Sequence, residues 1–145
     1  MKPVDKFDIF EEDEVAVVLA VTPDEHFIVT KMFRPGPEKV MSDLPGGYLK
    51  GRTSLDATQQ HLLTQTGYRG NIEYVNFNYE NPYSTRIRHN LVAKDCVLQE
   101  GYSVNDFSGC VVELYSLNDL IKVLESGQTN DAITAYTGLR HLGYI

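Results

Sequence analysis

The stretch of sequence that decides the fold covers residues 44–68 and reads LPGGYLKGRTSLDATQQHLLTQTGY. A Leu-Pro-Gly-Gly turn leads through a short loop into a segment whose apolar spacing predicts a helix over residues 55–66. Ser54 is expected to cap the start of this helix with its hydroxyl, and Gly67 is expected to end it. The side chains expected to point inward recur every three or four residues and are Leu55, Thr58, Leu62 and Thr66.

Outside this stretch, strand-like and helix-like segments alternate along the chain. The near-continuous apolar run at residues 15–21 is typical of a strand covered on both faces, and residues 26–33 are expected to form its partner strand. Further strands are predicted at residues 71–79, 86–97 and 110–115, and further helices at residues 116–125 and 131–142. The last helix is expected to carry Ile133, Tyr136, Leu139 and Leu142 on one side. This alternation favours layers of helix around a mixed sheet.

Length and charge limit the class of protein. The 145 residues fit one domain, residues 1–145, with residues 1–14 as a short N-terminal lead. A formal net charge of −7 argues against nucleic-acid and anionic-membrane partners, so an anionic ligand would need a local basic cluster. The apolar run at residues 15–21 is too short to span a bilayer, and the acidic lead lacks the features of a signal peptide. Cys96 and Cys110 are expected to be buried reduced thiols, and the protein is expected to be cytoplasmic.

The helix, the glycines and their surroundings resemble those of the Nudix (MutT-like) hydrolases, which cut pyrophosphate bonds in nucleoside diphosphates linked to another group. Residues 34–37 (RPGP) before residues 43–47 (DLPGG) are similar to the segment that enters the signature box in the ADP-ribose pyrophosphatase branch. Residues 81–85 (NPYST) and the tail from Val112 resemble that branch as well. The resemblance implies an α/β fold, the Nudix α/β/α sandwich around a mixed β-sheet. It also implies a nucleoside-diphosphate-type small-molecule ligand, Mg or Mn as cofactor where hydrolysis is retained, and a homodimer.

Every position that matches a signature glutamate of the box carries another residue. The family's Arg-Glu pair falls on Gln60-His61, its Glu-Glu pair on Thr64-Gln65, and its loop glutamate on Arg52, with a one-residue gap ahead of Gly51. In the family these carboxylates share one helix face and hold the divalent cations that neutralise charge and position water. The residues at the glutamate positions of the box bring no negative charge, so we expect no metal, no cofactor and no efficient hydrolysis.

The candidate ligand-binding positions are Arg34, Gly46, Gly47, Arg52 and Arg86. Arg52 is expected either to contact a phosphate or to be an exposed loop arginine. Arg34 is expected either to hold the ligand or to pair with Glu38 or Asp43. For Gly46 and Gly47 a role in backbone geometry is favoured, although in this branch the carbonyl at Gly46 contacts metal. Among the remaining candidates, a hydrogen-bonded helix position is favoured for His61, packing for Tyr48, Tyr79 and Tyr83, and a solvated approach for residues 11–14.

Three functions remain open from the sequence. The first is a degenerate member of the family that binds a nucleotide-type ligand without cleaving it. The second is an active pyrophosphohydrolase that uses acids outside the box, and the candidates are Glu38, Asp43, Asp56, Glu80 and Glu100. Glu100 and Asp106 lie in the loop where some relatives carry a further catalytic glutamate. The third is a structural or protein-interaction role.

Overall fold

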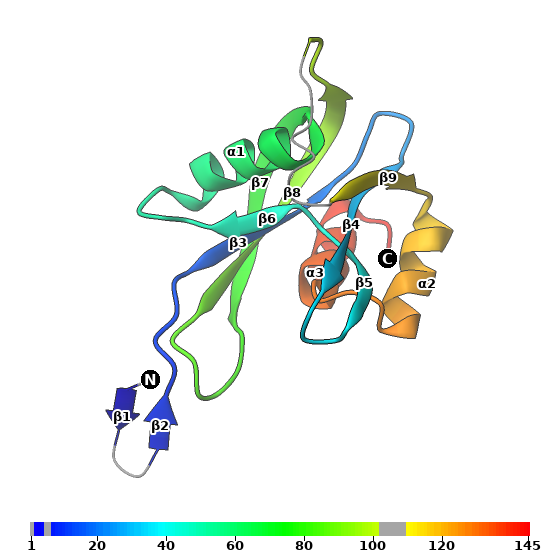
Figure 1. The fold of residues 1–145 in the computed structure, drawn as a ribbon. Helices are drawn as coiled ribbons and strands as arrows, with labels where there is room; N and C mark the ends of the chain where they lie inside the picture. Colours follow the sequence, from blue (N-terminus) through cyan, green and yellow to red (C-terminus); the bar gives the residue numbers. More distant parts are fainter. Residues whose placement is uncertain (1, 5–6, 102–109) are drawn as a thin grey trace.

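The computed structural model describes residues 2–4, 7–101 and 110–145. Strands and helices alternate as the sequence predicts, and Figure 1 labels them in chain order. The strands are β1 (Lys2–Val4), β2 (Phe7–Ile9), β3 (Val15–Ala20), β4 (Phe27–Arg34), β5 (Lys39–Asp43), β6 (Gly46–Tyr48), β7 (Tyr68–Tyr79), β8 (Ile87–Leu98) and β9 (Val111–Tyr115). The helices are α1 (Ser54–Thr66), α2 (Leu117–Ser126) and α3 (Ala132–Leu142).

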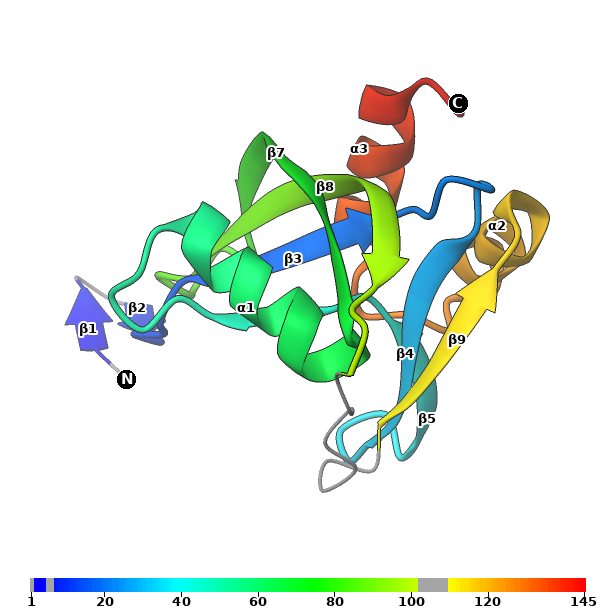
Figure 2. The ribbon, with the colours of Figure 1, turned by 90° about the horizontal axis from the view of Figure 1, so that it is seen from above.

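A mixed sheet of order β6-β3-β8-β7 forms the centre of the fold. Strands β3 and β8 run parallel, whereas β3–β6 and β7–β8 are antiparallel pairs. Figures 1 and 2 show α1 on one side of this sheet and α3 on the other. The predicted α/β/α sandwich around a mixed sheet is therefore confirmed.

The central strand β3 feeds two hydrophobic cores because its successive side chains point to opposite faces. Val17 and Leu19 pack with Leu139 of α3, while Ala16 and Val18 pack with Leu62 of α1. All residues of β3 are at most 9% exposed. The prediction of a strand covered on both faces is confirmed.

A second sheet, of order β5-β4-β9, corrects the predicted strand pairing. Residues 26–33 were expected to pair with residues 15–21, but β4 pairs with β5 and β9, and one isolated bridge, Val21 to Phe27, links it to the preceding chain. Both edges of β3 are already taken by β6 and β8, so the chain has to carry β4 into another sheet. Strands β5 and β6 lie where no regular structure was predicted.

The predicted boundaries of α1 need two corrections. Its N-cap is Thr53, whose hydroxyl accepts a hydrogen bond from the backbone N–H of Asp56 at 3.1 Å, and Ser54 is the first helical residue. Leu55 was expected to be buried but is 46% exposed, because Ala57 occupies the inward position of the first turn. Gly67 ends the helix as predicted, with a φ of 80°.

Helix α3 packs on the sheet through small residues together with Leu139, and not through the whole apolar stripe that was expected. Ile133 and Tyr136 are 51% and 46% exposed, whereas Leu139 is fully buried. A Cβ atom added to Gly138 would lie 2.8 Å from a methyl carbon of Leu19, so the helix lies too close to β3 for larger side chains. The prediction from apolar periodicity was therefore wrong for Ile133 and Tyr136, which were expected to share one side with the buried Leu139.

Burial disfavours the reactive thiolate form of both cysteines. Cys96 is a free cysteine, is 1% exposed, and burial raises the pKa of its thiol to about 11. Burial also raises the pKa of the half-buried Cys110. Within the described ranges, no helix has both the length and the apolarity needed to cross a membrane.

Candidate functional site

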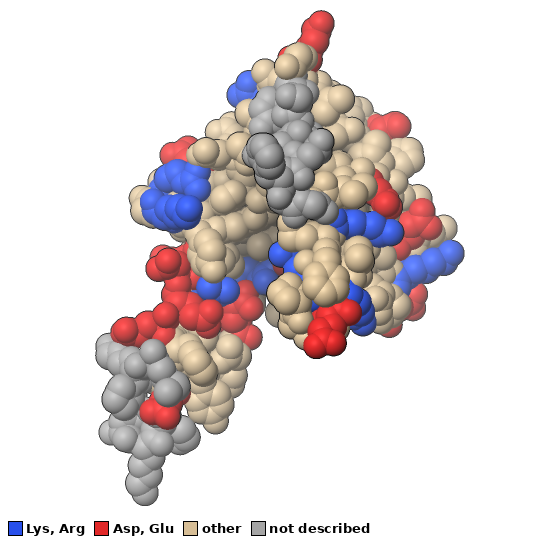
Figure 3. All heavy atoms as spheres, viewed as in Figure 1, with Lys and Arg blue, Asp and Glu red and all other residues tan. Residues whose placement is uncertain are grey.

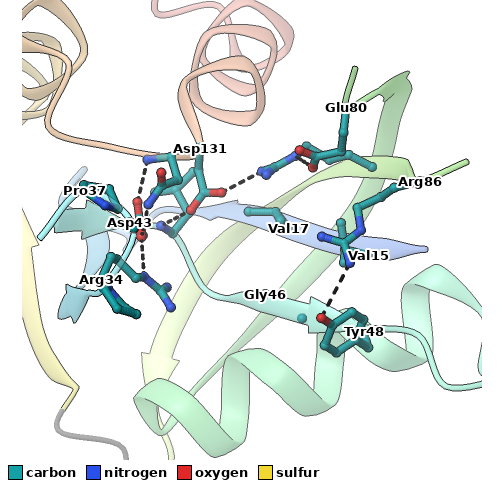
Figure 4. A pocket seen from close by; sticks show the side chains of 16 residues that line it. Val15, Val17, Arg34, Pro37, Asp43, Gly46, Tyr48, Glu80, Arg86 and Asp131 are labelled. Carbon is teal, nitrogen blue, oxygen red and sulfur yellow. Dashed lines mark hydrogen bonds and ion pairs between the residues drawn. The ribbon is translucent and has the colours of Figure 1, made fainter. Parts of the chain in front are cut away.

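A cleft of about 450 Å³ lies where the two sheets meet the start of α3. Figure 3 shows this hollow with basic side chains inside it and acidic side chains gathered beside it. Val15 and Val17 of β3 form part of its floor, and Figure 4 shows Arg34 and Arg86 on opposite sides of them. The other lining residues come from four parts of the chain. The β4–β5 turn contributes Pro35, Gly36 and Pro37, and the segment from the end of β5 through β6 contributes Asp43, Leu44, Gly46, Gly47 and Tyr48. Glu80 and Arg88 come from the β7–β8 hairpin, and Asn130 and Asp131 directly precede α3.

Gly46 and Gly47 are needed for close approach rather than for unusual backbone angles. Neither belongs to the described glycines that adopt a positive φ. A Cβ atom on Gly46 would lie 2.5 Å from the carbonyl oxygen of Ala16, and one on Gly47 would lie 2.8 Å from the imidazole of His61. The two glycines therefore serve the backbone, as favoured from the sequence, because they let β6 lie directly against both β3 and α1.

Each arginine of the cleft has a carboxylate partner. The Nε of Arg34 lies 3.0 Å from Asp43, and an Nη of Arg86 lies 3.2 Å from Glu12. Arg88 is held between two acids, 2.8 Å from Glu80 and 2.6 Å from Asp131. Arg34 is thus paired with Asp43, one of the two acids considered for it, and its side chain, which lines the cleft, remains 41% exposed.

Two buried carboxylates, Asp43 and Asp131, tie the start of α3 to both sheets. Asp43 accepts hydrogen bonds from the backbone N–H and side-chain amide of Asn130, at 2.7 and 3.1 Å. Asp131 accepts from the backbone N–H of Leu44 at 2.8 Å and from Arg88. Burial raises the pKa of Asp131 above its ordinary value, whereas the charge of Arg88 acts in the opposite direction. The position of the turn that opens the box thus depends on the C-terminal helix.

Arg86 connects the cleft to the acidic lead. Its guanidinium lies over the ring of Tyr48, 5.3 Å from the ring centroid, and its Nε donates to the carbonyl of Asp13 at 3.0 Å. Glu12 also accepts from Ser84, and Glu14 lies 2.7 Å from His89. The lead was expected to be solvated, but Glu12 and Glu14 are paired with the β7–β8 hairpin and its loop.

The loop and helix positions that replace the box glutamates bond to the chain itself. Arg52 donates to the carbonyls of Leu49 and Tyr48, at 3.0 and 3.3 Å, and to the side chain of Gln60. The hydroxyl of Thr64 donates to the carbonyl of Gln60 at 2.8 Å. Arg52 is not among the residues that line the cleft described above, whereas Arg34 and Arg86 are; Arg52 reaches the cleft lining through its hydrogen bond to Tyr48.

His61 and Gln65 face strand β6. The Nε2 of His61 lies 2.9 Å from the carbonyl oxygen of Tyr48, and a carbonyl can only accept, so this nitrogen carries the proton. The carboxamide of Gln65 makes two hydrogen bonds to Gly46: its Nε2 donates to the carbonyl at 2.8 Å, and its Oε1 accepts from the N–H at 3.2 Å. The favoured hydrogen-bonded role of His61 matches this geometry.

The residues at the box do not fit a magnesium or manganese ion. Such ions need several oxygen ligands, of which carboxylates are the most common. Within the described part of the chain, no group of three or more His, Cys, Asp or Glu residues is placed to hold a metal. The carbonyl of Gly46, a metal contact in the resemblance, already accepts from Gln65.

The acids outside the box are dispersed. Glu38, Asp56 and Glu100 are exposed, and Asp106 lies outside the described residues. Asp43 and Glu80 do line the cleft, but both are paired with arginines. Sequence reasoning missed the role of Asp131, although an aspartate directly before a helix is a recognisable N-terminal signal.

Comparisons with known proteins support the architecture. No family model matches the sequence. The chain is 30% identical over 135 residues to an ADP-ribose pyrophosphatase of Bacillus subtilis (strain 168), and the alignment covers 90% of this chain and 73% of that protein. A crystal structure of an ADP compounds hydrolase is similar with a TM-score of 0.73 at 17% identity, covering 91% of this chain and 75% of that one. The second match is a likeness of fold alone.

Proposed function

Because the chain belongs to the Nudix hydrolase superfamily, in its ADP-ribose pyrophosphatase branch, we propose that it binds a nucleoside-diphosphate-type ligand in the cleft without hydrolysing it efficiently. One observation carries this proposal. The positions of the box glutamates hold no carboxylate, whereas Arg34 and Arg86 line the neighbouring cleft. The arginines that can hold phosphates are thus present, whereas the glutamates that metal-assisted cleavage needs are replaced.

The two arginines supply the basic cluster that an acidic protein needs for an anionic ligand. A guanidinium binds phosphate through paired, charge-assisted hydrogen bonds, and these need no metal. Arg34 and Arg86 line the cleft from opposite sides, as Figure 4 shows, so a nucleoside-diphosphate-type ligand that extends across β3 would have a guanidinium toward each end. The ligand would compete with Asp43 and Glu12 for the guanidinium groups, which limits the affinity.

Calorimetric titration with ADP-ribose tests this binding. We expect Arg34→Ala and Arg86→Ala each to weaken binding by about 10-fold or more, since one charge-assisted hydrogen bond contributes roughly 1.5–3 kcal/mol. Arg140→Ala is the matched control, because Arg140 is an exposed arginine of α3 that does not line the cleft. Arg52→Ala in the same titration tests the ligand-binding role predicted for Arg52. Failure of the wild-type protein to bind ADP-ribose or related nucleoside diphosphates would leave the structural role as the better explanation.

The predicted homodimer is part of the same proposal. Figure 1 shows the β1–β2 hairpin standing apart from the other elements, and an isolated two-stranded hairpin is marginally stable in water. Pairing with a second copy would stabilise it. Light scattering coupled to gel filtration should give twice the mass of 16.4 kDa, and a mass of one chain would contradict the proposal. One domain over residues 1–145 and a cytoplasmic location stay predictions.

A further inference from the structure

Two of the α1 side chains that replace the box acids, His61 and Gln65, face strand β6 with hydrogen-bond donors. We propose that the Gln65 carboxamide, assisted by His61, holds α1 against β6 in place of a divalent cation. The cleft is then organised, and takes up its ligand, without such an ion; the statement about the ligand rests on the proposed function. The argument uses three hydrogen bonds between α1 and β6.

The spacing of the two elements matches. His61 and Gln65 are four residues apart on α1, which is about 6 Å along a helix axis. Their partners, Tyr48 and Gly46, are two residues apart on β6, which is roughly 6.6 Å along a strand. The helix can therefore lie along the strand and meet both carbonyls at once. Glycine at position 47, between the two partners, leaves room for the imidazole ring, since a Cβ there would lie 2.8 Å from it.

The chemistry of the replacements is consistent along the loop and the helix. Gln65 donates to the carbonyl of Gly46, and His61 donates to the carbonyl of Tyr48. Arg52 donates to the carbonyls of Tyr48 and Leu49. A glutamate carries only acceptors when ionised, so at these positions it would face carbonyl oxygens and repel them unless a cation lay between. The donors remove the need for that cation.

Gln65 is the replacement that best takes over the role of a cation-bound glutamate. A carboxamide has both a donor and an acceptor, so it satisfies the carbonyl and the N–H of Gly46 together. A carboxylate of the same shape keeps the bond to the N–H and loses the bond to the carbonyl. Gln65→Glu therefore changes one hydrogen bond into a contact between two oxygens while leaving the side-chain volume nearly unchanged.

Thermal unfolding of the ligand-free protein tests the proposal. The melting temperature of the wild type should shift by less than about 1 °C between EDTA and 10 mM manganese or magnesium chloride. Gln65→Glu should lower it by about 5 °C in EDTA, and manganese should restore at least half of that loss. Gln65→Met is the matched control: it keeps the length of the side chain, loses both bonds, and should melt lower in either buffer without responding to manganese.

Three results would overturn the proposal. One is a wild-type protein that melts several degrees lower in EDTA, and another is a Gln65→Glu variant that melts with the wild type. The third is an equal loss in the Glu and Met variants with no recovery in manganese, which would make the pair an ordinary contact. Titration of ADP-ribose into wild-type protein should give the same Kd, within about twofold, in EDTA and in magnesium. Binding only with magnesium would overturn the cation-free cleft but not binding itself, and the melting tests hold whether or not ADP-ribose binds.

Discussion

Purified protein is expected to release AMP from ADP-ribose at least ~1,000-fold more slowly than an ADP-ribose pyrophosphatase with an intact box, in magnesium and in manganese alike. The physical reason is the loss of several groups at once. Removal of one group that stabilises the transition state commonly costs about 100- to 1,000-fold in rate. Here the positions that would hold the cations carry Arg52, His61, Thr64 and Gln65, and these side chains bond to the chain itself.

The assay distinguishes the degenerate protein from an enzyme that uses other acids. The Bacillus subtilis relative serves as the positive control under the same conditions. Any AMP released by the wild type should be compared with that released by Glu100→Gln, with Glu125→Gln of α2 as the control for an exposed glutamate that is not a candidate acid. Turnover near that of the relative, lost in Glu100→Gln and kept in Glu125→Gln, would contradict our proposal and favour the active pyrophosphohydrolase.

Asp131→Ala should lower the free energy of unfolding by about 3 kcal/mol, which corresponds to a loss of roughly 6–12 °C in melting temperature for a chain of this size. The substitution leaves Arg88, whose side chain is 12% exposed, with Glu80 as its remaining acidic partner. It also removes the acceptor for the backbone N–H of Leu44 in the interior. Urea unfolding followed by circular dichroism measures the change.

The control for this substitution is Asp119→Ala. Asp119 lies in the first turn of α2, close to a helix start as Asp131 is, but it is exposed, so its loss should cost less than about 1 kcal/mol. Asp131→Asn should fall between the two, because an amide oxygen can still accept from Leu44 but carries no charge for Arg88. An Asp131→Ala protein as stable as the Asp119→Ala protein would show that the buried ion pair does not hold the start of α3.

Local sequence patterns predicted the elements of the fold correctly where one interaction dominated. The apolar run of β3 and the end of α1 at Gly67 were predicted correctly. A strand buried on both faces needs apolar residues at every position, and a left-handed C-cap favours glycine, so both features can be read from residue type. Strands β5 and β6 were missed because both are short and rich in residue types that are uncommon in strands, which are lysine and aspartate in β5 and glycine in β6. Their pairing, not their composition, makes them strands.

The candidate site was also predictable only in part. The sequence showed that the box had lost its acids, since that is a matter of residue identity. It did not show that Arg34 and Arg86 share a cleft and that Arg52 lies outside it. It also gave no sign that Asp131 holds the turn before the box, because the two segments are 87 residues apart in sequence.

Residue identity alone determined the family resemblance and the missing carboxylates at the signature positions of the box, because both depend on which side chains follow one another. Tertiary structure decided what the replacements do. A carboxamide, an imidazole and a guanidinium act as donors here because the backbone carbonyls of residues 46, 48 and 49 lie within hydrogen-bond distance of them. Hydrogen bonds depend on distance and direction, and these exist only once α1 and the strand beside it have packed together.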